Sequence, residues 1–142
     1  MIVSVYIVDH RIHRAKRLWK LSGCGNRKDA FELLPAEPFN SIERTCERVK
    51  NLRPNVILVN YDLGQGRRLN GVNVVRALII EGYKGHIVAN CAKGAERFGP
   101  SGVKVDGDTN RKPRGLWNAL EQSRKWYDKN RPLLEVPSSP SA

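Results

Sequence analysis

The chain of 142 residues is long enough for one domain with a sizeable core, and its composition, 40% hydrophobic and 27% charged, is that of a globular protein. No apolar run approaches the roughly 20 residues of a membrane span, and the apolar start lacks the basic region and cleavage site of a signal peptide, so we expect a cytoplasmic protein. Cys24, Cys46 and Cys91 lack the spacing of a zinc site or disulfide framework, which predicts free, buried or half-buried thiols.

The charge is strongly positive, because 25 Lys and Arg against 14 Asp and Glu give a formal net charge of +11. From Arg11 to Lys28 there are seven basic residues and no acidic one. A field of this sign attracts nucleic acid, anionic lipid or an acidic protein surface. The same residues also fit a solvated helix face that keeps the protein in solution, and the sequence leaves both interpretations open.

Apolar spacing predicts alternating strands and helices in the first part of the chain. Runs rich in Val and Ile indicate buried strands, and apolar residues three and four positions apart indicate amphipathic helices. Glycines after residue 22 end the first helix, and Asn40 followed by Glu43 is typical of the start of the second. The elements expected here are a strand over 2–8, a helix over 10–21, a strand over 30–34, a helix over 42–52 and a strand over 55–60.

The second part of the chain continues the alternation after a Gly-rich loop over residues 64–71. Val103 and Val105 predict a brief fifth strand, and Leu116, Leu120 and Tyr127 form the expected inner side of the last helix. The elements expected here are a helix over 72–79, a strand over 86–90, a short helix within 91–100, the fifth strand, and a helix from about Arg114 to Lys129. We expect a domain over 1–130 and a disordered, Pro- and Ser-rich tail over 131–142.

Strands that alternate with helices predict an α/β fold, a three-layer sandwich with a flavodoxin-like, doubly wound parallel sheet of five strands. Functional residues of such folds gather at the carboxyl ends of the strands. This rule selects Asp9–His10, Asn60–Asp62, Asn90–Cys91 and the segment 106–113.

The segment Pro54–Gly64 resembles the third strand of a response-regulator receiver domain, a module of two-component signalling. Asn70–Gly71 before an aliphatic helix and the approach to the fourth strand over 82–89 strengthen the resemblance, which covers about residues 2–129. In that family the third strand ends in an aspartate that accepts a phosphoryl group from a histidine kinase. The matching residue here is Asn60, and an amide cannot form an acyl phosphate by that route.

The resemblance also implies a changed metal site around Asn60. The family closes its first strand with two acidic residues that hold magnesium together with the acceptor aspartate, and the matching residues are Asp9 and His10. Magnesium prefers charged oxygen ligands, so we expect no tight magnesium binding and no other cofactor. Asp62 either restores part of an acidic pocket or caps its loop and faces solvent.

Two further residues of the resemblance depart from the family. The switch hydroxyl after the fourth strand matches Cys91, and a thiol is a poor hydrogen-bond donor to phosphoryl oxygen. The family's lysine after the fifth strand matches Lys112, although extra residues intervene. The scaffold is retained and the chemistry is not, which indicates a pseudo-receiver; the alternative is another flavodoxin-like domain.

The leading functional hypothesis is a phosphorylation-independent, stand-alone signalling module that acts by protein contact, and we find no pattern of an enzyme. The resemblance implies a contact face made by the fourth and fifth strands and the last helix. That face would be basic and aromatic, which suits an acidic protein partner or a homodimer. Its expected residues are Lys104, Trp117, Arg124, Lys125, Trp126 and Tyr127.

The alternative hypothesis is weak, sequence-tolerant binding of nucleic acid or another polyanion. Phosphate contacts would come from the first helix, and a Gly-rich loop with two arginines either cradles an anion or is simply exposed. His10 and His13 lack an obvious metal spacing and fit a surface pair. The candidate anion contacts are Arg11, Arg14, Lys16, Arg17, Arg67 and Arg68.

Overall fold

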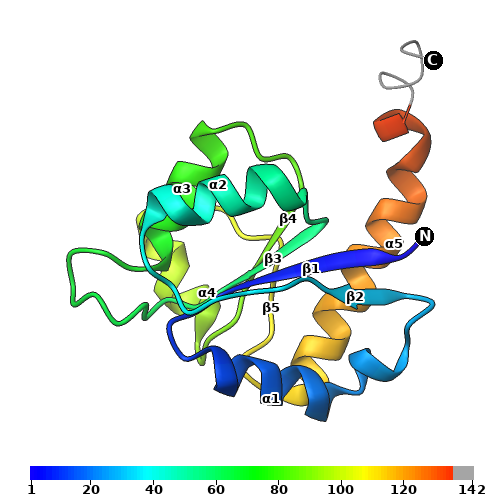
Figure 1. Cartoon of the computed structure of the whole chain (residues 1–142), viewed down its shortest axis with the longest axis horizontal. Coiled ribbons are helices and arrows are strands. Elements are labelled where there is room, and N and C mark those ends of the chain that lie inside the picture. The colour runs from blue at the N-terminus through cyan, green and yellow to red at the C-terminus, as the bar shows by residue number, and fades with distance from the viewer. Residues whose placement is uncertain (136–142) are drawn as a thin grey trace.

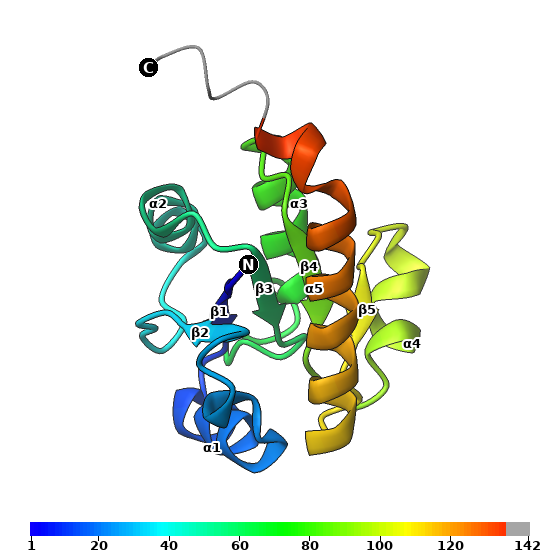
Figure 2. The same ribbon diagram turned by 90° about the vertical axis from the view of Figure 1, so that its right-hand side faces the viewer.

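A computed structural model of the chain describes residues 1–135 and has one parallel sheet between two layers of helices (Figure 1, Figure 2). The strand order is β2-β1-β3-β4-β5, and every neighbouring pair is parallel. This confirms the predicted flavodoxin-like, five-stranded sheet. The strands are β1 (Val3–Val8), β2 (Phe31–Leu33), β3 (Val56–Val59), β4 (His86–Ala89) and β5 (Gly107–Asp108).

The helices cover both faces of the sheet. Two of them, α1 and α5, pack on one face, and the other three cover the opposite face (Figure 2). Ser41 is the residue that caps α2, one position after the predicted Asn40, because its hydroxyl accepts a hydrogen bond from the Arg44 amide. The helices are α1 (Ile12–Ser22), α2 (Ile42–Leu52), α3 (Gly71–Ile80), α4 (Gly94–Phe98) and α5 (Pro113–Glu135).

The buried residues of β1 show how one strand serves both layers. Successive side chains of a strand point to opposite faces of the sheet. Val3, Val5 and Ile7 therefore pack with α1 and α5, whereas Tyr6 and Val8 pack with α2 and α3. Burial on both faces explains why this strand reads as a continuous apolar run.

The predicted fifth strand at Val103 and Val105 is wrong by a few residues. Both valines pack as half-buried residues against the core beside α4. The chain begins to pair with β4 at Asp106, whose main chain donates to the Ile87 carbonyl and whose carboxylate accepts from the Ile87 amide. These contacts with β4 place the strand at Gly107–Asp108, although glycine and aspartate are poor strand formers.

The last helix has the predicted inner side, since Leu116, Leu120 and Tyr127 are buried. The helix continues to Glu135, past the predicted boundary at residue 130. The remainder of the predicted tail, 136–142, lies outside the described residues. Within the described part of the chain, no helix has the length and apolar character needed to cross a membrane.

Candidate functional site at the carboxyl edge of the sheet

Three polar residues form a row at the carboxyl ends of the central strands. Strand pairing sets Val8 beside Val59, and Val59 beside Ala89. The next residue of each strand is Asp9, Asn60 or Asn90, with 1%, 3% and 2% of its surface exposed. The residues that the sequence selected at three separate strand ends are therefore brought together, in a place that is nearly closed to solvent.

Asp9 is the only acidic member of this row, and its Oδ1 accepts two hydrogen bonds. The Arg11 main-chain N–H donates at 2.9 Å, and the Nδ2 of Asn60 donates at 3.2 Å. The Oδ2 of Asp9 is buried and has no hydrogen-bond partner among the described residues. A buried carboxylate is costly unless a positive charge lies close to it.

Arg111 supplies that positive charge. Its Nη2 lies 3.6 Å from Asp9 Oδ2, and its side chain is 26% exposed. The residue sits in the β5–α5 connection with a φ of 54°, in the left-handed region that non-glycine residues rarely occupy. Thr109, which is fully buried, accepts the Arg111 main-chain N–H on its hydroxyl and so fixes the turn.

His10 closes one side of the site. Its Nδ1 is 3.6 Å from Asp9 Oδ1 and has no hydrogen-bond partner among the residues described. The ring packs against Gly64, where a side chain would collide with the imidazole. Gly64 also has a φ of 75°, so this loop position requires glycine on two grounds.

Asp62 is exposed and lies in the loop after β3. Its Oδ1 accepts the Gly64 amide at 2.9 Å. That hydrogen bond is the main reason that the pKa of Asp62 lies below its usual value, with smaller contributions from His10, Arg11 and Arg97. In the structure the Asp62 carboxylate therefore caps its own loop.

The end of β4 contributes Asn90 and Cys91 to this edge of the sheet. The Oδ1 of Asn90 accepts the Thr109 hydroxyl at 2.7 Å, and both side chains are buried. Burial raises the pKa of the Cys91 thiol, and a main-chain hydrogen bond with Tyr61 opposes that shift in part. Lys112 is exposed just before α5, and the cation that lies close to Asp9 is Arg111.

The predicted anion contacts are exposed and unpaired. One of them precedes α1, three lie on α1 and two lie in the loop after β3, and none makes an ion pair with another described residue. They are Arg11, Arg14, Lys16, Arg17, Arg67 and Arg68. The structure brings Arg11 to the carboxyl edge through its main chain alone, because its N–H, and not its guanidinium, binds Asp9.

Arg111 and Thr109 are the site residues that sequence reasoning missed. Both lie in the segment 106–113, which the strand-end rule selected as a whole. Within that segment, the position of β5 decides which side chain points inward, and the predicted strand was displaced. No other signal in the sequence distinguishes Arg111 from Lys112.

The architecture and this edge define a receiver-like, flavodoxin-type fold. No family model matches the sequence, and no curated protein matches it. A response regulator of the LuxR family from an Aurantimonas species superposes with a TM-score of 0.65 at 12% identity, over 88% of this chain and 86% of that one. The receiver domain of a Francisella response regulator gives 0.61 at 12% identity, over 87% and 97%.

A third similar structure is a DNA-binding response regulator of the LuxR family from Staphylococcus aureus. Its TM-score is 0.62 at 14% identity, over 87% of this chain and 99% of that one. Identities this low establish a shared fold and do not carry over an activity. The solved structures that this chain is similar to are therefore receiver domains in fold, and its function must be argued from its own residues.

Proposed function

We propose that this chain is a receiver-like signalling module that acts by protein contact, without phosphorylation of an aspartate at the carboxyl edge. The observation that supports it is the hydrogen bond from the Asn60 amide to Asp9, with both side chains buried. An amide at the acceptor position has no carboxylate oxygen to attack a phosphoryl group. Its NH₂ group is moreover occupied in holding the one neighbouring acid.

Neither nearby acid replaces the missing acceptor in this proposal. Asp9 is 1% exposed and is already held by Arg11, Asn60 and Arg111. Asp62 is exposed, but its carboxylate caps the Gly64 amide outside the buried row. Phosphorylation of Asp9 would require these contacts to break first.

The same residues do not fit the magnesium ion that a receiver fold implies. Magnesium binds hard oxygen ligands and favours carboxylates. The row offers one carboxylate, and the guanidinium of Arg111 lies 3.6 Å from it. Within residues 1–130, no three His, Cys, Asp or Glu side chains gather where they could hold a metal ion. We therefore propose that the module works without magnesium and derive no step through it.

Intact-mass measurement after incubation with acetyl phosphate and magnesium tests this proposal. We expect the mass to stay unchanged, while a receiver domain that keeps its acceptor aspartate gains one phosphoryl group in parallel. A stable adduct that peptide fragmentation assigns to Asp9 or Asp62 would overturn the proposal. NMR of the Asn60 side-chain amide in the same protein, recorded with and without magnesium, tests metal binding directly.

The expected contact face needs revision in detail. Tyr127 is buried, and Trp117 lies on the α1 side, where Arg27 stacks 5.2 Å from its ring. Arg124 is engaged with Glu121 on the same helix. The exposed cations that remain of this set are Lys104 and Lys125. Exposed cations of this kind suit an acidic partner surface.

A second candidate function is polyanion binding, because the exposed face of α1 carries cations and no acid. The helix has no acidic residue in its first turn, and its basic side chains form no ion pair with a described residue. Arg14 and Arg17 are one turn apart on that face. Unpaired cations in a row are what a phosphate backbone binds.

Titration of duplex DNA at low and moderate salt, read by fluorescence anisotropy, tests the second candidate. If α1 binds phosphates, the double variant Arg14→Gln/Arg17→Gln lowers affinity and reduces the salt slope by about one per lost contact. The matched control, Lys84→Gln/Lys104→Gln, removes the same charge from exposed residues elsewhere on the surface that form no ion pair with a described residue. Equal loss in both variants would indicate net charge alone, and no binding at low salt removes this candidate.

A further inference from the structure

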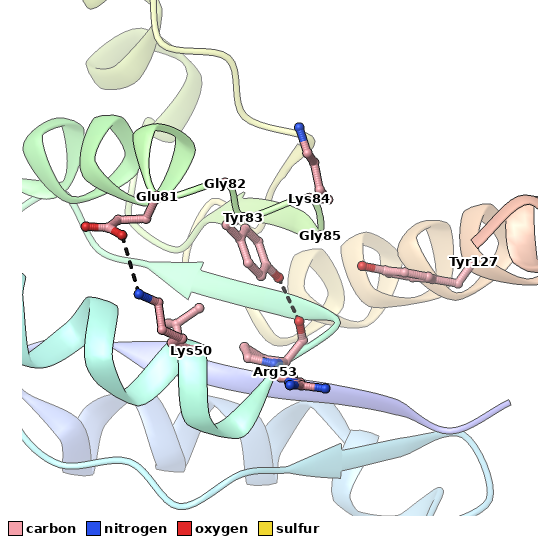
Figure 3. Close-up of a pocket in the computed structure, with 10 residues that line it drawn as sticks. Lys50, Arg53, Glu81, Gly82, Tyr83, Lys84, Gly85 and Tyr127 are labelled. Atoms are coloured by element: carbon pink, nitrogen blue, oxygen red, sulfur yellow. Dashed lines mark hydrogen bonds and ion pairs between the residues drawn. The ribbon is translucent and has the colours of Figure 1, made fainter. Parts of the chain in front are cut away.

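A pocket of about 340 Å³ lies at the opposite, amino edge of the sheet. It opens between the end of α2, the bend at Pro54, the α3–β4 turn and Tyr127 of α5 (Figure 3). Its volume is within the range of small-molecule sites, about 300–1,000 Å³. None of its lining residues belongs to the row around Asn60. A ligand here would act independently of the carboxyl edge.

The walls of the pocket are apolar and held in place. Val49 and Pro54 are buried, and the rings of Tyr83 and Tyr127 complete the apolar part of the lining. The Tyr83 hydroxyl donates to the Pro54 carbonyl at 3.0 Å, and the Tyr127 hydroxyl donates to the Asn55 carbonyl at 2.6 Å. Burial raises the pKa of both tyrosines, so both stay neutral at physiological pH. The rings are thus fixed before any ligand arrives.

The charged groups at the rim are not equivalent. Lys50 lies 3.7 Å from Glu81 and forms an ion pair with it, so no free acid lines the pocket. Lys84 is exposed, and its ammonium points away from the other labelled residues (Figure 3). Arg53 lies at the pocket and is exposed, with no ion pair or side-chain hydrogen bond to a described residue. The guanidinium of Arg53 is therefore the polar group available to a ligand.

The backbone at Arg53 supports a role beyond capping α2. Arg53 ends the helix with a φ of 51°, in the left-handed conformation. Glycine is the residue that this helix-end position ordinarily favours, because it has no Cβ to strain. An arginine kept in a strained conformation, beside an apolar cavity, suggests that its side chain is used.

We propose that this pocket binds a small apolar carboxylic acid, with its ring or branched body between Tyr83 and Tyr127 and its carboxylate on Arg53. A guanidinium pairs with a carboxylate through two parallel hydrogen bonds, which fixes orientation as well as charge. A cationic ligand finds no free acid among the lining residues.

Titration of the protein with 3-phenylpropanoate, followed by the NMR signals of the Gly82, Tyr83 and Gly85 amides, tests the proposal. We expect saturable shifts at these amides, and affinity at least about tenfold weaker for the uncharged 3-phenylpropanamide. Absence of shifts up to about 10 mM acid, the weak end of measurable affinity, overturns the proposal. Equal affinity for acid and amide also overturns it.

The variant Arg53→Gly separates binding from folding. Glycine relieves the left-handed conformation, so we expect an unchanged or higher melting temperature together with about a tenfold loss of affinity for the acid. Lys84→Gln removes a charge that points away, and its affinity should stay within about twofold. If Arg53 merely caps the helix, Arg53→Gly leaves affinity unchanged, and the proposal fails. This outcome does not depend on the phosphorylation test at Asn60.

Discussion

The Nδ2 of Asn60 donates to the Oδ1 of Asp9 at 3.2 Å, across two neighbouring strands and out of contact with solvent. Under the proposed function, the bond joins the residue at the phosphoacceptor position to the one acid of the row. A carboxylate at position 60 could not make it, since it has no donor at neutral pH. The asparagine is therefore part of how the edge of the sheet is held together, and not merely an inactive replacement.

The variant Asn60→Asp should lose stability. It removes the donor to Asp9 and places two carboxylates within hydrogen-bond distance in a buried row. We expect a loss of about 1–3 kcal/mol in the free energy of unfolding at pH 7, measured by urea titration. The loss should shrink at pH 5, because two close carboxyl groups share a proton.

The exposed Asn118 provides the control for this charge change. Asn118→Asp should stay within about 0.5 kcal/mol of the parent at both pH values. Equal stability of Asn60→Asp and the parent protein would mean that the row tolerates a second acid. In that case the metal-free proposal would lose its support.

Arg111 should matter to stability more than its exposed neighbour Lys112. Removing the guanidinium leaves the Asp9 carboxylate buried with no close cation. Arg111→Met should therefore lower the free energy of unfolding by about 1–3 kcal/mol, less than for a fully buried pair because Arg111 is partly exposed. Lys112→Met, which removes an exposed charge, should change the free energy of unfolding by less than about 0.5 kcal/mol.

A double-mutant cycle of Asp9→Asn and Arg111→Met isolates the pair. Once Asp9 is neutral, Arg111→Met should cost little, which gives a coupling energy of about 0.5–3 kcal/mol. Additive effects of the two substitutions would show that Arg111 acts through the backbone turn alone. They would also remove the argument that it compensates the buried acid.

The region of β5 shows where sequence reasoning stops. The central strands could be predicted because burial on both faces makes them continuous apolar runs, as at Val56–Val59. The fifth strand is Gly-Asp and has no such pattern; hydrogen bonds from β4 select it. Since a shift along the chain changes which side chains face inward, the displaced strand also concealed Arg111. Residues near the predictable strand ends, such as Asp9 and Asn60, were found.

Stability should fall as the pH drops below about 6.5, the pKa of histidine in the unfolded chain, because the pKa of His86 is lowered in the folded protein. Burial is the main cause of its lowered pKa, and Asp106 opposes this shift in part. The Ser123 hydroxyl is 2.9 Å from its Nδ1, and the Trp126 ring lies 4.5 Å from the imidazole at a tilt of 41°. The unfolded chain, with a histidine pKa of about 6.5, takes up the proton first as the pH falls. The contribution of His86 to the free energy of unfolding is therefore present above about pH 6.5 and is lost below it.

Urea unfolding of the parent protein and His86→Gln above and below about pH 6.5 checks the effect. The parent should lose stability on acidification, and the variant should lose less. Hydrogen bonds from Gly64 and Arg44 are the main reason that the pKa values of Asp62 and Glu37, respectively, are lowered. These two carboxyl groups therefore change the stability only at lower pH. Identical pH slopes for parent and variant would show that His86 does not titrate differently in the two states.

Gly71 should not tolerate a side chain, because it lies directly against Asn60. Its amide donates to the Tyr61 carbonyl at 2.8 Å, and a Cβ there would overlap the Asn60 carbonyl oxygen and the Phe98 ring. Gly71→Ala must push α3 away from the end of β3, and overpacking of this kind costs about 1–3 kcal/mol. Gly99→Ala is the matched control, because no atom lies within 4 Å of a side chain built at Gly99.

Urea unfolding of both alanine variants separates local crowding from the general effect of replacing glycine. Gly99→Ala should be neutral or stabilising by up to about 1 kcal/mol, through loss of unfolded-state entropy. Gly71→Ala should also shift the NMR signal of the Asn60 side-chain amide, since the collision is with the carbonyl of that residue. If Gly71→Ala is as stable as the control and leaves that signal in place, the close approach of α3 does not position Asn60.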